Sequence, residues 1–124
     1  MCDDIGGWIS ANTAGYWGAD SASNPVETSW AQQTIYGAPL PVLLATNKTM
    51  TGADIRSNLA AITCPALVIH GDVDRSVPLP ITGQPTAALL PFGNLTVISG
   101  AGHGLYTSHA AAFTRHMIDV VTAN

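Results

Sequence analysis

The sequence predicts an α/β fold in which helices precede a short βαβα unit with parallel strands. Residues 66–69 are continuously apolar, which is typical of a strand covered on both faces in a parallel sheet. Residues 95–98 form a second strand-like run, and residues 85–90 between them fit a short helix. Such a strand–helix–strand unit is normally right-handed, and because its strands are parallel, their carboxyl ends meet at one edge of the sheet.

Residues 1–60 are predicted to form a separate helical segment. A short amphipathic helix is possible over residues 3–10, although each glycine there costs about 1 kcal/mol relative to alanine. The aromatic side chains of this stretch indicate either anchors of a loop or the wall of a pocket.

Three further helices are predicted before the first strand. Asn24 can cap a helix that has Pro25 at its first position and Glu27 as its capping-box partner, and Gly37 ends it after about Tyr36. A second helix is expected from Pro41 to about Met50. Asp54 can cap a short helical turn that ends near Leu59.

Residues 61–124 hold the predicted βαβα unit. Pro65 suits the first residue of a strand, and residues 91–94 suit a turn. Thr107 or Ser108 can cap the last helix, whose apolar residues recur at three- and four-residue steps and are expected to face the sheet: Ala110, Phe113, Met117, Val120 and Val121.

Composition narrows the class of protein. With 124 residues, 47% of them hydrophobic and 10% charged, the chain is long enough for one domain and too apolar for disorder. A net charge of −4 and scattered basic residues (Lys48, Arg56, Arg75 and Arg115) argue against nucleic acid or an anionic membrane as partner. Cys2 and Cys64 lack disulfide or metal spacing, and neither a signal peptide nor a membrane span is recognisable. We therefore expect a cytoplasmic protein.

Acidic and histidine side chains follow both predicted strands. His70, Asp72 and Asp74 come directly after the first, and His103 lies in the glycine-rich turn after the second. These groups should share one edge of the sheet. Asp72 is expected to order its own turn through backbone N–H groups, and His70 to pack at the strand end. A metal site built from these four residues is an alternative, but it explains less of the surrounding loops.

Two of these segments resemble the α/β-hydrolase superfamily. Residues 64–78 (CPALVIHGDVDRSVP) are similar to the segment that carries the catalytic acid, and residues 98–105 (ISGAGHGL) to the one that carries the histidine. Esterases related to cofactor-free bacterial haloperoxidases are the branch with the strongest resemblance. It implies that Asp74 is the acid and His103 the base, 29 residues apart in the order usual for these hydrolases. It implies no cofactor and no metal.

The same resemblance makes residues 1–60 a cap over the cleft. Trp30, Met50 and Leu105 are then candidates for the substrate pocket, with packing between helices as the alternative for Trp30 and Met50. His109 and His116 are expected at ordinary helix positions.

The serine of such a hydrolase is missing from the sequence. It would lie in a Gly-x-Ser-x-Gly motif, and neither Ser10 nor Ser99 has the required glycines. The resemblance thus covers the cap and C-terminal portion of a hydrolase, and the first strand would lack a neighbour on one side. Two hypotheses follow: an esterase for small acyl esters completed by a serine-bearing chain, or a non-catalytic scaffold that self-associates or partners such a chain. Perhydrolase or haloperoxidase activity would use the same residues.

Overall fold

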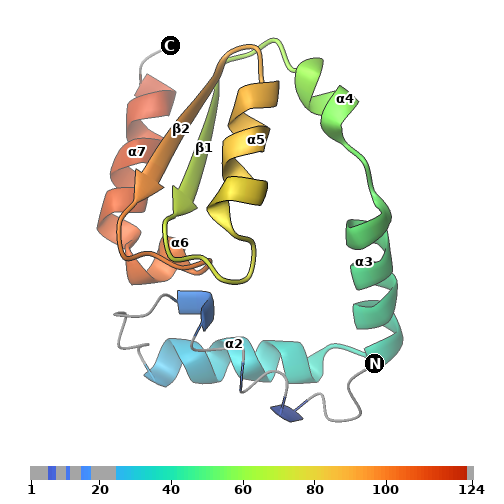
Figure 1. Ribbon diagram of the computed structural model, residues 1–124. Coiled ribbons are helices and arrows are strands. Elements are labelled where there is room, and N and C mark those ends of the chain that lie inside the picture. The colour runs from blue at the N-terminus through green and yellow to red at the C-terminus, as the bar shows by residue number, and fades with distance from the viewer. Residues whose placement is uncertain (1–5, 8–10, 12–14, 18–24, 123–124) are drawn as a thin grey trace.

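A computed structural model of the chain describes residues 6–7, 11, 15–17 and 25–122 (Figure 1). Two strands, β1 (Ala66–Gly71) and β2 (Gly93–Ile98), pair in parallel. The 3₁₀ turn η1 (Leu79–Ile81) and helix α5 (Gly83–Leu89) connect them. The predicted α/β class and its parallel strands are therefore confirmed.

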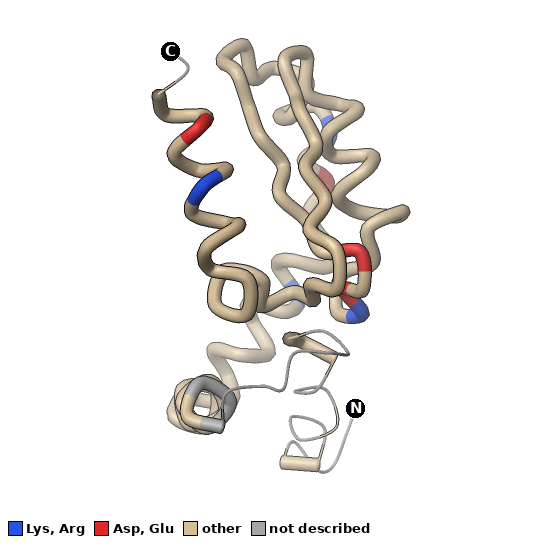
Figure 2. Tube along the Cα trace, turned by 90° about the vertical axis from the view of Figure 1, so that its left-hand side faces the viewer, with Lys and Arg blue, Asp and Glu red and all other residues tan. Residues whose placement is uncertain are grey.

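One helix lies on each side of this small sheet. In Figures 1 and 2 the strands run between α5 and α7 (Ala110–Thr122), which follows the short helix α6 (Leu105–Ser108). Ile98, Ala101 and Leu105 are buried together, and three half-buried side chains pack against them: Ile69, Ala112 and Phe113. The core therefore sits directly beneath the loops that end the strands.

The predicted cap of the last helix is wrong. Thr107 and Ser108 both lie inside α6, where their hydroxyls donate to the carbonyl of Gly104 at 2.9 and 3.3 Å. Hydroxyls of this kind can bond back to a carbonyl three or four residues earlier, so they stabilise a helical turn that has already begun. The chain then leaves helical geometry at His109 (φ −125°) before α7 starts.

The three helices before the sheet form an open arc around one side of the α/β unit (Figure 1). They are α2 (Pro25–Gly37), α3 (Leu40–Gly52) and α4 (Arg56–Ala60). The bounds of α2 match the prediction, while its expected cap, Asn24, lies outside the described residues. α3 starts one residue earlier than predicted and ends two later. The possible helix at residues 3–10 falls mostly outside the described part of the chain.

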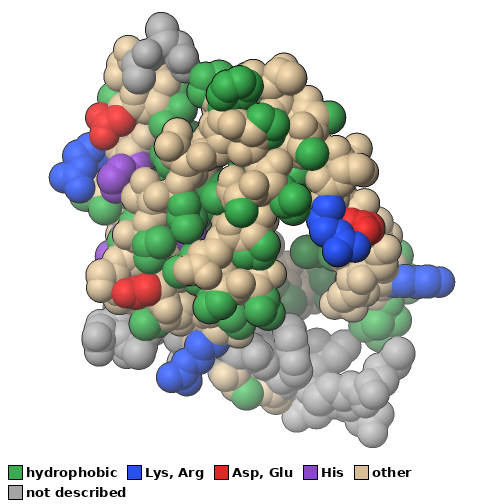
Figure 3. Space-filling view, turned by 45° about the horizontal axis from the view of Figure 1, so that its top comes forward, with side chains coloured by type: hydrophobic (Ala, Val, Ile, Leu, Met, Phe, Trp, Pro, Cys, Tyr) green, Lys and Arg blue, Asp and Glu red, His purple; other side chains and the backbone are tan. Residues whose placement is uncertain are grey.

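Most large apolar side chains of α2 and α3 are exposed. Val26, Trp30 and Met50 have exposed fractions of 74%, 61% and 73%. On α7, Phe113 packs against the core as expected, but Met117 and Val121, which belong to the stripe expected to face the sheet, are exposed, and so is Ile118. The two strands are too few to cover the whole stripe. Figure 3 shows apolar side chains spread over the face that is turned forward, with few charges among them.

The basic side chains stand apart along the chain and form no stripe (Figure 2). Arg56 is ion-paired with Asp54, whose carboxylate also accepts the Arg56 backbone N–H at the start of α4. Within the described residues, no helix has both the length and the apolar character needed to cross a membrane.

We predict that Gly100→Ala destabilises the chain by about 1–2 kcal/mol, because Gly100 has φ +75°, in the left-handed region where a Cβ is strained. Urea unfolding followed by circular dichroism measures the change. Gly52→Ala is the matched control, since a Cβ there meets nothing within 4 Å and alanine favours a helix. Equal effects of the two substitutions would show that the turn after β2 carries no such strain.

Candidate active site

Asp74 lies in the loop after β1 and is 7% exposed. One carboxylate oxygen, Oδ1, accepts the backbone N–H groups of Ser76 and Val77, both at 2.9 Å. This turn fixes the orientation of the carboxylate, because two donors hold one oxygen in place. The other oxygen, Oδ2, remains available for a partner on the neighbouring loop.

That partner is His103, in the loop after β2. Its Nδ1 lies 2.9 Å from Asp74 Oδ2, and 41% of the histidine side chain is exposed. A carboxylate only accepts hydrogen bonds, so the proton of the neutral imidazole is on Nδ1 and its Nε2 is a free base. The structure thus brings together the two residues that the sequence nominated as acid and base.

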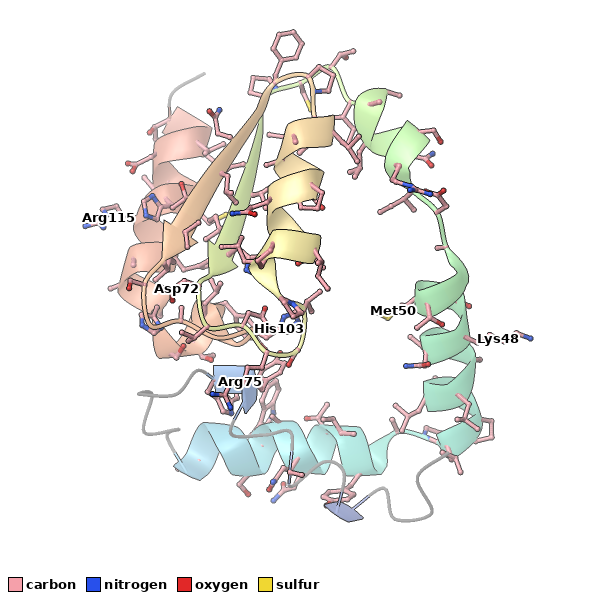
Figure 4. All side chains as sticks on the ribbon, in the orientation of Figure 1. Lys48, Met50, Asp72, Arg75, His103 and Arg115 are labelled. Carbon is pink, nitrogen blue, oxygen red and sulfur yellow. The ribbon has the colours of Figure 1, made fainter. Side chains whose placement is uncertain are left out.

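Asp72 has a different role from the one we expected. Its carboxylate accepts the hydroxyl of Ser99 at 3.0 Å and the N–H of Gly100 at 2.7 Å, both in the loop after β2. The prediction that Asp72 orders its own turn is therefore wrong, because the nearest free donors belong to the neighbouring loop. Asp72 joins the two loops beside the Asp74–His103 pair, and Figure 4 shows Asp72 and His103 at the same edge of the sheet.

A close backbone approach also holds these loops together. A Cβ at Gly71 would overlap the carbonyl of Ala101, so only glycine allows the end of β1 to lie against the second loop. The N–H of Val73 donates to that same carbonyl at 3.2 Å. These backbone contacts hold the two loops against each other beside Asp74 and His103.

Residues Tyr16 and Trp17 hold the histidine loop from its other side. The N–H groups of Gly102 and Gly104, which flank His103, donate to the carbonyls of Trp17 and Tyr16 at 3.2 and 2.7 Å. Trp17 is buried at 2% exposure, and a Cβ at Gly104 would overlap its ring. The sequence suggested that the aromatic residues near the N-terminus anchor a loop. Nothing in it indicated that Tyr16 and Trp17 hold the loop of His103.

The ring of Tyr16 also contacts His103 directly. The two rings meet edge to face, with centroids 5.1 Å apart. Burial raises the pKa of Tyr16, and the hydrogen bond at 2.9 Å to the Tyr106 hydroxyl and the negative charge of Asp74 raise this pKa further. Tyr16 therefore stays neutral beside the imidazole at physiological pH.

The remaining histidines lie outside this pair. His70 sits half-buried at the end of β1, close to Asp74. His109 lies between α6 and α7, and its Nδ1 contacts the Ser108 hydroxyl at 2.9 Å. His116 is within α7. Among the described residues, no group of three or more His, Cys, Asp and Glu side chains could hold a metal ion.

The three candidate pocket residues are spread over the fold. Leu105 is buried with Ile98 and Ala101 directly after the histidine loop. Trp30 and Met50 are exposed on α2 and α3, and Met50 points to the side of α3 that faces α5, whereas Lys48 points away (Figure 4). Hollows of about 460 and 310 Å³ border α7, away from Asp74 and His103. Pocket lining by Trp30, Met50 and Leu105 stays a prediction.

A buried carboxylate that orients a partly exposed imidazole can take part in proton transfer. The imidazole accepts a proton at Nε2, and the carboxylate stabilises the resulting cation. This geometry would allow the imidazole to activate a hydroxyl nucleophile, but the sequence contains no Gly-x-Ser-x-Gly motif to provide one.

Comparison with known proteins identifies this architecture. No family model matches the chain. It superposes on a bromoperoxidase from Bacillus anthracis with a TM-score of 0.89 and 26% identity, over 97% of this chain and 45% of that one. An esterase from Exiguobacterium antarcticum shares the fold, with a TM-score of 0.83 and 19% identity over 94% of this chain and 42% of the esterase. The chain belongs to the α/β-hydrolase superfamily and carries part of its fold.

Within that superfamily, the chain is similar to haloperoxidases and esterases. A bifunctional esterase/perhydrolase from Acinetobacter calcoaceticus is 30% identical over 99 residues, which are 77% of this chain and 34% of the relative. The chain thus spans about a third of that relative and under half of the two solved structures.

We predict that Asp74→Asn moves the His103 proton from Nδ1 to Nε2. The N–H groups of Ser76 and Val77 keep the amide oxygen, so the amide NH₂ group faces His103 and requires an acceptor. The ¹⁵N chemical shifts of the imidazole report the tautomer.

Asp72→Asn is the control for this substitution. It weakens the link between the loops and leaves the proton on Nδ1, because Asp72 bonds Ser99 and Gly100 and not the imidazole. Retention of the Nδ1 proton in Asp74→Asn would contradict the pairing.

Proposed function

We propose that this chain supplies the acid and base of a Ser–His–Asp ester hydrolase, with the serine supplied by another segment or chain. The observation that carries the proposal is the 2.9 Å contact between His103 Nδ1 and the buried Asp74 carboxylate, which leaves Nε2 of a 41% exposed imidazole unused. A triad histidine needs this combination of a bound Nδ1 and an accessible Nε2.

The steps of the proposed reaction follow from this geometry. His103 Nε2 accepts the proton of the serine hydroxyl as the hydroxyl attacks the ester carbonyl, and then gives that proton to the departing alkoxide. Asp74 stabilises the imidazolium that exists between the two transfers. Water then hydrolyses the acyl-enzyme by the same proton transfers. We propose small acyl esters as the substrates; the names of the Acinetobacter calcoaceticus and Exiguobacterium antarcticum proteins support ester hydrolysis as the reaction.

Perhydrolase or haloperoxidase activity would use the same pair. Hydrogen peroxide would replace water in the attack on the acyl-enzyme, and His103 would again take the proton. The names of the relatives, an esterase/perhydrolase and a bromoperoxidase, support both reactions.

Two features support a separate source for the serine. The chain spans 34% of its esterase/perhydrolase relative, and β1, which is apolar on both faces, has β2 as its only partner among the described strands. Exposed apolar side chains on α2, α3 and α7 offer further surface for a serine-bearing segment or chain.

In the completed enzyme, we propose that Trp30 and Met50 line the acyl pocket. The exposed free thiol of Cys64 suits a reducing, cytoplasmic setting.

A chimera tests the proposal. This chain replaces the matched part of the Acinetobacter calcoaceticus relative, and p-nitrophenyl acetate hydrolysis is measured. We expect the chimera to be active, with kcat lowered by about 10⁶ in His103→Ala and by about 10⁴ in Asp74→Asn. The chain alone should show no turnover above its own His103→Ala variant.

Asp72→Asn in the same chimera is the matched control, with kcat expected to stay within about tenfold of the parent because Asp72 does not contact the imidazole. A chimera as active with His103→Ala as without it would overturn the proposal.

A second candidate function is association without catalysis, and the edge of β1 that has no neighbouring strand among the described residues favours it. The N–H groups of Ala66 and Asp72 donate to carbonyls at the two ends of β2. Because alternate residues of a strand in a parallel sheet face the same neighbour, the N–H and C=O groups of Leu67 and Ile69 point away from β2. An unpaired edge of this kind is a template for another strand.

We predict that Leu67→Pro reduces self-association of the isolated chain, because it removes an outward N–H group without removing a β1–β2 hydrogen bond. Light scattering after size exclusion should show the mass falling toward 12.8 kDa. Leu95→Pro, the analogous change at the outer edge of β2, is the comparison. A larger fall in mass for Leu95→Pro would place the association at the other edge.

A further inference from the structure

The imidazole of His103 needs more than one contact to keep a fixed direction. In the part of the chain that the structure describes, its one hydrogen bond joins Nδ1 to Asp74 Oδ2 at 2.9 Å, and 41% of the side chain is exposed. A ring held at a single atom can still swing about that bond, and such a motion changes where Nε2 points. Because a misplacement of about 1 Å can slow a reaction by about 10²-fold, a base held in this way gains from a second contact.

The ring of Tyr16 makes that second contact. Its centroid lies 5.1 Å from the centroid of the His103 ring, and the two planes are inclined by 63°. This distance and this angle fall within the range in which edge-to-face pairs of aromatic rings attract each other. Asp74 holds one nitrogen of the imidazole and Tyr16 contacts its ring, so the two residues together restrict the motion of His103.

Tyr16 is itself held by the segment that carries the histidine. Its backbone carbonyl accepts the N–H of Gly104 at 2.7 Å, and its hydroxyl is hydrogen-bonded to the hydroxyl of Tyr106 at 2.9 Å. Gly104 and Tyr106 lie one and three residues after His103. The ring of Trp17 packs against Tyr16 as well, with centroids 4.9 Å apart and the planes at 84°. A ring fixed at these points can hold a neighbouring ring in place.

The bond between the two tyrosine hydroxyls persists over the physiological range of pH. Burial raises the pKa of Tyr16, and the hydrogen bond to Tyr106 and the charge of Asp74 raise this pKa further. The Tyr16 hydroxyl therefore keeps its proton, and its ring stays uncharged beside the imidazole.

We propose that Tyr16 is a positioning residue for His103, whose ring keeps the imidazole against the Asp74 carboxylate and whose hydroxyl bond to Tyr106 keeps that ring in place. The proposal rests on the acid–base assignment made under the proposed function. The two backbone bonds that hold the histidine loop involve no side-chain atom of Tyr16, so they remain when that side chain is changed. The role of the side chain can therefore be measured apart from the attachment of the loop.

Proton exchange at His103 Nδ1 tests the proposal on the full chain, without a need for the serine. The Nδ1–H proton reaches water only when its bond to Asp74 opens, so its exchange rate at a fixed pH reports how often the imidazole moves away. In a chain labelled with ¹⁵N-histidine, we expect Tyr16→Leu to raise this rate by about two- to tenfold, which corresponds to the loss of one aromatic pair. Tyr36→Leu, at an exposed tyrosine of α2, is the matched control and should leave the rate unchanged.

A second proton separates positioning of the imidazole from stability of the fold. The N–H of Ala66, which donates to the Phe92 carbonyl at 3.0 Å, lies at the end of the sheet opposite to the site. We expect Tyr16→Leu to accelerate exchange at Ala66 by a smaller factor than exchange at Nδ1. An equal factor for both protons would show that the Tyr16 side chain only stabilises the fold, and would overturn the positioning role.

Two conservative variants test the bond between the hydroxyls. Tyr16→Phe and Tyr106→Phe each keep the aromatic ring and remove the same hydrogen bond. Each should raise the Nδ1–H exchange rate by less than Tyr16→Leu does, and the double variant should match either single one, because the bond can be lost only once. Additive effects of the two substitutions would show that the hydroxyls act separately, and would overturn the part assigned to Tyr106.

An Asp74→Asn measurement separates the two levels of the proposal. If a protected Nδ1–H signal persists in Asp74→Asn, or is absent from the parent chain, the acid–base pair is overturned and the role of Tyr16 falls with it. If Asp74→Asn abolishes the signal and Tyr16→Leu leaves the exchange rate unchanged, the role of Tyr16 is overturned and the acid–base pair stands.

Discussion

The parallel pairing of β1 with β2 is the constraint on which the site depends. Because the strands run in the same direction, their carboxyl ends emerge side by side, and Gly71 lies opposite Ile98 in the register. The loop that carries Asp74 and the loop that carries His103 leave from these two positions. A shift of one residue in this register would turn every side chain of a strand to the other face and separate the two groups.

The loops at the carboxyl ends of β1 and β2 are held by more contacts than the helices that surround the sheet. Asp72, the close approach at Gly71 and the carbonyls of Tyr16 and Trp17 all converge on the two loops. By contrast, α3, α4 and α7 contain no buried residue. Burial of apolar surface is the main favourable term in folding. These three helices therefore gain little stabilisation from burial unless another protein surface covers their apolar side chains.

The sequence was sufficient for the parts of the structure that depend on local pattern. Apolar runs located both strands, and Pro25 and Gly37 located the ends of α2. The adjacency of Asp74 and His103 followed from βαβ topology together with the resemblance of two short segments to hydrolases. These features are encoded within a few residues of one another.

Contacts between distant segments could not be derived in this way. Nothing local distinguishes Asp72, which bonds across to Ser99, from an aspartate that bonds its own turn. The docking of Trp17 under Gly104 joins two residues that lie far apart in the chain. Thr107 and Ser108 have the side chains of caps, but the carbonyl of Gly104 was within reach and made them part of a helix instead.

Two backbone hydrogen bonds beside His103 join its loop to the segment that holds Tyr16 and Trp17. Gly102 and Gly104 donate to Trp17 and Tyr16, one bond on each side of the histidine. A movement of Tyr16 and Trp17 away from the sheet would pull on both flanks of the imidazole at once. The orientation of the His103 ring is therefore mechanically linked to a segment that lies almost ninety residues before it in the chain.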